Sequence, residues 1–293
     1  MDTIESEWVK QARIGNNIPS YDKEFFIEIE NYIIKTCAKY DLTCKYNVGP
    51  LIGGVPPRDD ISVIVNPLVN AISYHDVMGG ILISTRNAEL NCRNVDKILK
   101  CNADTDISDT VLSKLNDKYV LKANDQVYDK VIFIPGSNLF HTIDWEKIDE
   151  AMIDNPHAVI KLHPVITEQS AQMIKNKWIG RVIDENMSGL QLLNSASTIW
   201  TSYNSEFGLI ASLKELPFSC LSKWNDVFSM TYAPIYRNLK YKDLKYNRNV
   251  VSKVLSSKHS GYVFPWQEDW KERIETYFES IHRFKRGMEY PYV

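Results

Sequence analysis

The sequence has no apolar run that approaches about 18 residues, the length a helix needs to cross a membrane, so we expect no membrane span. Its first residues are acidic and lack the basic and apolar regions of a signal peptide. Cysteine is scarce: the chain has five, scattered and without a CxxC pair. This pattern argues against a disulfide framework or a zinc cage and favours reduced thiols. We therefore expect a cytoplasmic protein.

The sequence also lacks an excess of charge of one sign. Its formal net charge of −3 excludes a globally basic nucleic-acid binder, so any contact with nucleic acid would need a local patch. Apolar residues make up 44% and charged residues 24%, which is typical of a folded globular protein. With 293 residues the chain is longer than a usual domain of roughly 100–200 residues, so we expect two domains.

The first half of the chain shows few elements. Apolar residues at spacings of three and four predict a helix over residues 25–37, and β-branched runs predict strands at 61–65 and 81–83. Residues 102–126 are polar, and we place a domain boundary near Asn124. We therefore expect an N-terminal domain of residues 1–124.

The second half alternates strands with helices. Strands are predicted at 131–135, 158–162, 182–183 and 198–200, each followed by a helical segment. Such alternation implies βαβ crossovers and a parallel, Rossmann-like sheet, which we assign to a second domain of residues 125–265. Residues 266–293 carry an apolar stripe at helical spacing, and we expect this helix to pack across both domains.

Three loops of the second half stand out, because ligands of open parallel sheets bind at the carboxyl ends of the strands. Ser137 follows the first strand, His163 follows the second, and residues 201–205 (Thr-Ser-Tyr-Asn-Ser) lead from a strand into a helix. Hydroxyls and free N–H groups at a helix start favour an anion, which the imidazole of His163 could share. The alternative stays open that His163 caps a helix and that residues 201–205 form a polar turn.

The strand Val-Ile-Lys-Leu that ends in His163-Pro164, residues 201–208 about forty positions later, and Leu216-Pro217 form an ordered set. This set resembles the C-terminal half of the HP-motif GT-B glycosyltransferases, which include capsule-polysaccharide transferases and bacterial polysialyltransferases. The resemblance spans roughly residues 130–220. It implies an α/β fold with two Rossmann-like domains facing a cleft, a C-terminal helix crossing between them, and an inverting, metal-independent sugar transfer.

The resemblance also implies a donor site. By position, His163 would contact the donor phosphate, and Ser205 would bind the same phosphate, with Asn204 in place of the first Ser of the family's pair. Ser137, Thr201 and Glu206 complete the candidate residues of this site. The co-substrate would be a nucleotide sugar of UDP or CMP type, with no other cofactor.

One position departs from the family's pattern. The acidic residue that holds the nucleotide ribose falls at Ile210 here. Glu206, one turn earlier, could replace it, although its direction would differ. The identity of the nucleotide therefore stays open.

If the resemblance holds, the N-terminal domain of residues 1–124 should bind the acceptor and supply the catalytic base. An inverting transfer needs a carboxylate or a histidine that takes the proton of the acceptor hydroxyl. The candidates are Asp76, His75 and Asp60, and we favour Asp76 over Asp60. The alternatives are a helix start at His75 and a turn with solvated carboxylates at Asp59 and Asp60.

A metal site is not expected. Residues 104–106 (Asp-Thr-Asp) match the DxD metal motif of another glycosyltransferase fold, but the preceding residues 97–101 make a poor strand. Without a buried strand to aim both carboxylates at one cation, a solvated turn is the better interpretation.

Residues 236–248 form a tract of basic and aromatic side chains that suits a phosphate backbone or stacked rings. Its basic residues are Arg237, Lys240, Lys242, Lys245 and Arg248. A solvated basic loop is the alternative. Two acceptors stay open: the resemblance implies a surface glycan, and this tract would suit hydroxymethylcytosine-type DNA of a bacteriophage, modified in the cytoplasm of an infected host.

Two further hypotheses about the function stay open. A nonhydrolysing nucleotide-sugar 2-epimerase would share the fold, although those enzymes are longer and use several carboxylates around the sugar. A non-catalytic nucleotide-binding or capsid-associated protein would explain the departure at Ile210.

Overall fold

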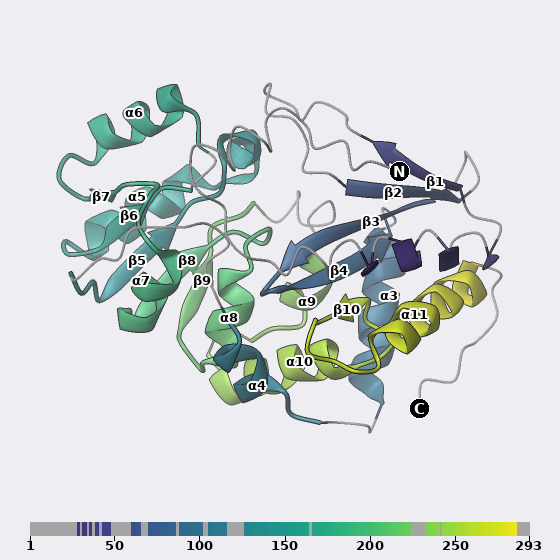
Figure 1. The fold of residues 1–293 in the computed structure, drawn as a ribbon. Helices are drawn as coiled ribbons and strands as arrows, with labels where there is room; N and C mark the ends of the chain where they lie inside the picture. The colour runs from purple at the N-terminus through teal and green to yellow at the C-terminus, as the bar shows by residue number, and fades with distance from the viewer. Residues whose placement is uncertain are drawn as a thin grey trace.

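The computed structural model shows a mixed α/β protein built on two five-stranded sheets (Figure 1). The structure describes residues 28–29, 31–33, 35–36, 39–40, 43–47, 60–65, 70–85, 88–101, 105–115, 126–163, 166–223, 232–240 and 242–285. One sheet is parallel and belongs to the second half of the chain. The other sheet is antiparallel, and the last of its strands comes from near the end of the chain.

The antiparallel sheet has the order β1-β2-β3-β4-β10. Its strands are β1 (Thr43–Asn47), β2 (Asp60–Val65), β3 (Asn70–Val77), β4 (Gly80–Thr85) and β10 (Tyr262–Val263). The expectation of a Rossmann-like layer in the first half is therefore wrong. Neighbouring parallel strands need crossovers of a dozen or more residues, whereas β3 and β4 are joined by Met78 and Gly79 alone.

The parallel sheet has the order β7-β6-β5-β8-β9, and each of its pairs is parallel, as the alternating pattern predicts. Its strands are β5 (Lys130–Phe133), β6 (Val159–Lys161), β7 (Val182–Ile183), β8 (Thr198–Thr201) and β9 (Phe218–Cys220). The connections contain the 3-10 helix η1 (Ser137–Thr142) and the helices α5 (Trp145–Asp154), α6 (Glu168–Lys177), α7 (Gly189–Ser195) and α8 (Phe207–Leu213). The strand order changes direction at β5, which lies between β6 and β8.

The last part of the chain returns to the antiparallel sheet. Helices α9 (Ala233–Tyr236) and α10 (Leu244–Ser256) pack against α3 (Ala88–Lys100), and the short α4 (Ser108–Ser113) packs against α8. Helix α11 (Trp270–Lys285) follows β10. Its buried residues Ile274, Tyr277, Phe278 and Ile281 share a cluster with residues of β4, so the apolar stripe covers this sheet. The division into three domains stays a prediction.

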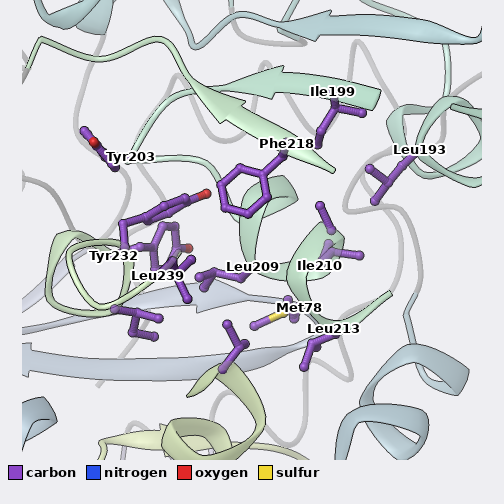
Figure 2. Packing of buried hydrophobic residues seen from close by; sticks show 14 of the residues in the cluster. Met78, Leu193, Ile199, Tyr203, Leu209, Ile210, Leu213, Phe218, Tyr232 and Leu239 are labelled. Atoms are coloured by element: carbon purple, nitrogen blue, oxygen red, sulfur yellow. The ribbon is translucent and has the colours of Figure 1, made fainter. Parts of the chain in front are cut away.

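Strand β4 is buried on both faces. Ile81 and Ile83 belong to the cluster under α11, whereas Leu82 between them belongs to a second cluster, because successive side chains of a strand point to opposite faces. This second cluster also contains Met78, Leu209 of α8 and Phe218 of β9 (Figure 2). The two halves of the chain therefore share one apolar core.

Candidate functional site

The register of the parallel sheet brings the three predicted loops to one edge. Phe133 of β5 pairs with Lys161 of β6, and Ile132 pairs with Trp200 of β8, so the three strands end at nearly the same level. Ser137, His163 and residues 201–205 therefore follow the carboxyl ends of three adjacent strands. They surround the point where the strand order changes direction, which is where open parallel sheets bind ligands.

A buried lysine holds the loop that carries His163. Lys161 is 3% exposed, and its Nζ donates to the carbonyl oxygens of Leu162, at 2.5 Å, and Glu185, at 3.0 Å. A buried ammonium group needs such partners, because an unpaired charge is costly to bury. Lys161 therefore ties the end of β6 to the loop after β7. His163, two residues later, is half-buried, and Pro164 lies outside the described residues.

Ser137 links two loops of this edge. Its Oγ accepts the N–H of Thr167 at 2.9 Å and lies 3.2 Å from the hydroxyl oxygen of that residue. Thr167 in turn caps α6 by accepting the N–H of Ser170. The hydroxyl predicted to bind a ligand therefore also holds the start of α6 in place.

The loop after β8 is fixed at several atoms. Ser222 Oγ accepts the N–H of Tyr203 at 3.0 Å, and the hydroxyl of Tyr236 donates to the carbonyl oxygen of Ser205 at 2.8 Å. Ser205 Oγ accepts the N–H of Phe207 at 3.2 Å, which leaves the hydroxyl hydrogen of Ser205 for a ligand. Asn204 and Ser205 are both half-buried. The loop is thus anchored by side chains from two other segments, those of Ser222 and Tyr236.

Two hydroxyls of this loop are unusual. Thr201 and Ser202 are buried, and neither Thr201 Oγ1 nor Ser202 Oγ has a hydrogen-bond partner among the described residues. Buried polar groups are normally paired, so an orphan hydroxyl calls for an explanation such as a bound water or a functional role.

The side chain at position 210 cannot bind a ribose. Ile210 is buried in the core that both halves share (Figure 2). A carboxylate at that position would be buried among apolar side chains. The ribose-binding residue of the resembled family therefore has no counterpart on this face of α8.

Glu206 faces the antiparallel sheet. Its Oε2 accepts the N–H of Met78, in the β3–β4 turn, at 2.7 Å. The pKa of Tyr262 on β10 is raised, mainly by burial and also by the negative charge of Glu206. Nothing in the sequence indicates these contacts, because the residues involved are far apart along the chain.

The three candidate bases lie on adjacent strands. His75 and Asp76 are in β3, where they pair with Leu82 and Ile81, so the alternative of a helix start at His75 is wrong. Asp60 is the first residue of β2, and the β2–β3 register, continued along the strands, brings Asp60 level with His75. Asp59 lies outside the described residues. Their roles as bases stay a prediction.

The basic tract is partly neutralised. Arg237 forms an ion pair with Asp96, and Arg248 donates to Asp109 at 2.8 Å. Lys240 lies over the ring of Tyr246, 4.1 Å from its centroid. The tract also contains the end of α9 and the start of α10, so it is not a simple loop. Of its basic residues, the exposed cations without a described carboxylate partner are Lys240, Lys242 and Lys245.

The DxD match is only partly described, since residues 102–104 lie outside the described part. Asp106 Oδ1 accepts the N–H of Ser108 at 2.9 Å and the hydroxyl of Ser252 at 2.8 Å. The hydrogen bond to Ser108 is the main cause that lowers the pKa of Asp106 to about 2. Across the residues that the structure describes, no three His, Cys, Asp or Glu side chains gather where they could hold a metal ion.

None of the described helices combines the length and hydropathy needed to span a bilayer.

Comparison with known proteins gives little. No family model matches the sequence, and no curated protein does either. A solved structure from Listeria monocytogenes, assigned as a UDP-N-acetylglucosamine 2-epimerase, is similar over 70% of this chain with 8% sequence identity and a TM-score of 0.27. The match spans only about half of that protein, 54% of its chain. At this TM-score the likeness does not bear on the fold or the activity of the present chain.

Proposed function

We propose that this protein is a nucleotide-sugar-dependent glycosyltransferase related to the HP-motif GT-B enzymes. The observation that carries the proposal is that Ser137, His163 and residues 201–205 lie at the carboxyl ends of three adjacent strands, at the switch point of the parallel sheet. Hydroxyl, amide and imidazole groups at such an edge suit a diphosphate. The resemblance of the sequence independently assigns His163 and Ser205 to the donor phosphate.

In the proposed reaction, an acceptor hydroxyl oxygen attacks the anomeric carbon of the donor sugar. The bond between that carbon and the phosphate oxygen breaks, and the nucleotide leaves with the electron pair. His163, Asn204 and Ser205 donate hydrogen bonds to the phosphate oxygens as their charge grows, which is the usual role of preorganised donors. Thr201 and Ser202 would gain a partner if a phosphate oxygen or a water entered beside their hydroxyls.

The proton of the acceptor hydroxyl would pass to a base on the antiparallel sheet, and we favour Asp76, with His75 and Asp60 as the other candidates. Asp76 is two residues from Met78, whose N–H contacts Glu206 beside the donor loop. This proximity along the chain supports β3 as the acceptor side. We favour a glycan hydroxyl over modified DNA as the acceptor, because carboxylates hold both arginines of the basic tract.

The test is thermal unfolding of the full chain with UDP, CMP and their common sugars. A ligand that binds only the native state raises the unfolding midpoint. At one hundred times its Kd it adds about 2.7 kcal/mol to the free energy of unfolding. We expect at least one nucleotide to do so, and we expect His163→Ala to remove most of that gain. His157→Ala, which removes an exposed imidazole after α5, is the matched control and should keep the gain. If no nucleotide stabilises the protein, or if His163→Ala responds like the parent, the proposal fails.

Turnover then separates transfer from epimerisation. A transferase releases nucleotide from the nucleotide sugar faster when an acceptor is added, whereas an epimerase changes the sugar without releasing nucleotide and needs no acceptor. Glycan and hydroxymethylcytosine DNA acceptors are compared in the same assay. Binding without either reaction would instead support a non-catalytic nucleotide-binding protein.

A further inference from the structure

Glu206 joins the two halves of the molecule at one hydrogen bond. It follows Ser205 directly and precedes the first residue of α8, and its Oε2 accepts the N–H of Met78 at 2.7 Å. The bond is partly shielded from solvent. A carboxylate that accepts a backbone N–H forms a charge-assisted bond, which is stronger than a bond between neutral groups.

The β3–β4 turn that receives this bond has a demanding geometry. Met78 and Gly79 both have positive φ, 45° and 77°, which fits the tight turn of a two-residue hairpin. A left-handed conformation is costly for a residue with a side chain, so the surroundings must hold Met78 in place. The N–H of Met78 finds its acceptor in Glu206, a residue from the other half of the chain.

Packing fixes the same turn. The side chain of Met78 is 4% exposed and belongs to the same buried cluster as Leu209 and Leu213 of α8 (Figure 2). A Cβ at Gly80 would lie 2.5 Å from the carbonyl oxygen of Val263, so this end of the hairpin lies tightly against β10. The hairpin is therefore attached both to α8 and to the strand that closes its own sheet.

We propose that Glu206 is a positioning residue that couples nucleotide binding at residues 201–205 to the position of the β3–β4 hairpin. The inference rests on the proposed function and adds a connection between donor and acceptor sides. Because Glu206 is bonded to Ser205 through one peptide, a shift of the loop around a phosphate moves the acceptor of the Met78 N–H. Strand β3 ends at this turn and carries His75 and Asp76, so the coupling aligns the candidate bases with the donor.

Amide hydrogen exchange of the full chain tests the bond itself. In Glu206→Ala the amide of Met78 loses its acceptor, and we expect its exchange to accelerate about tenfold or more, as the loss of a hydrogen bond to a charged group implies. Glu206→Gln keeps a side-chain oxygen as acceptor but loses its charge, so its exchange should lie between those of the parent and Glu206→Ala. Glu150→Ala removes an exposed carboxylate from α5 and should change nothing at the hairpin. Unchanged exchange of Met78 in Glu206→Ala would overturn the inference.

The same measurement with UDP and with CMP tests the coupling. A nucleotide that raises the unfolding midpoint should slow exchange across β3 and β4 in the parent and in Glu206→Gln, but not in Glu206→Ala. In turnover, Glu206→Ala should lower kcat and leave the KM for the nucleotide sugar nearly unchanged, and Glu206→Gln should restore kcat. Nucleotide binding that protects the hairpin equally in Glu206→Ala overturns the coupling alone. Failure of both nucleotides to bind overturns the proposed function, and the coupling with it.

Discussion

The contact between α8 and α9 allows a quantitative test of the packing beside the candidate site. Gly208 lies in α8, and a Cβ built on it would be 1.9 Å from the hydroxyl oxygen of Tyr236 and 2.7 Å from its Cζ. Tyr236 is 2% exposed, and it packs edge-to-face on Tyr203 and Phe218 at centroid distances of 5.2 and 5.9 Å. The ring therefore has no free direction in which to retreat from a new methyl group.

The free energy of unfolding should fall in Gly208→Ala. Overpacking of a close-packed site costs roughly 1–3 kcal/mol. Displacement of Tyr236 would also break its 2.8 Å hydrogen bond to the carbonyl oxygen of Ser205, at a cost of about 1 kcal/mol. The higher helix propensity of Ala returns about 1 kcal/mol. The steric cost decides the sign, and we expect a net loss of about 2 kcal/mol.

A double-mutant cycle with Tyr236→Phe isolates the clash. This variant removes the oxygen that a Cβ at Gly208 would meet first. In the Phe background the cost of Gly208→Ala should therefore shrink by about 1 kcal/mol, a coupling of the size expected for residues in contact. Urea unfolding of the four proteins, with the slopes compared, gives the measurement. A neutral or stabilising Gly208→Ala, or costs that simply add, would refute the described packing of α8 on α9.

Two further predictions test other parts of the fold. Burial lowers the pKa of His259 from 6.5 to about 4 in the folded protein, so the unfolded chain takes up the proton first as the pH falls. The contribution of this group to the free energy of unfolding is fully present above about pH 6.5 and is lost towards pH 4, by about 3 kcal/mol. His259→Gln should flatten this decline between about pH 6.5 and 5. If the free energy from urea unfolding depends on pH in the variant as it does in the parent, the prediction is contradicted. Gly261→Ala places a Cβ 2.1 Å from the carbonyl oxygen of Ile83 at a φ of 79°, whereas Gly180→Ala has a φ of 73° but open space. Gly180→Ala should cost about 1–2 kcal/mol for backbone strain alone. Gly261→Ala adds the steric clash, so its melting midpoint should fall clearly further than that of Gly180→Ala. Equal falls in the two midpoints would show that the close approach of β4 and β10 is wrong.

The parallel sheet could be predicted from the sequence because its information is local. Each β-branched run is followed by a helical period, and a hydroxyl marks the start of a helix, as at Ser188, whose Oγ accepts the N–H of Gln191 at 3.1 Å. Parallel pairing then follows, because crossovers of that length favour it. The same rule about strand ends predicts from the sequence alone that Ser137 and His163 lie at one edge of this sheet.

The antiparallel sheet could not be predicted in this way. Its edge strand β10 is only two residues long, and Tyr262 pairs with Leu82, which is far away along the chain. Strand β3 contains His75 and Asp76, a polar pair that in isolation favours a helix start over a strand. Pairing between distant segments overrides such local preferences, which is why strand propensity depends so strongly on context.

The candidate site shows the same contrast between local information and contacts with distant segments. Residue type and position at a strand end predict the groups that we propose to face a ligand. The groups that hold these loops come from elsewhere in the chain. The sequence does not indicate that the carbonyl of Glu185 accepts from Lys161, that the N–H of Met78 donates to Glu206, or that the hydroxyl of Tyr236 donates to Ser205.

The anchoring of the loop after β8 also determines which part of the chain can act as a unit. Ser222 holds the N–H of Tyr203, Tyr236 holds the carbonyl of Ser205, and Met78 holds the carboxylate of Glu206. Two of these anchors belong to the second half of the chain, but the third belongs to the antiparallel sheet. A binding site is effective only when its supporting groups are in position before the ligand arrives. The parallel sheet alone would keep the residues proposed to face the ligand and lose the contact at Glu206, so the hairpin belongs to the proposed site even though it supplies none of the proposed phosphate ligands.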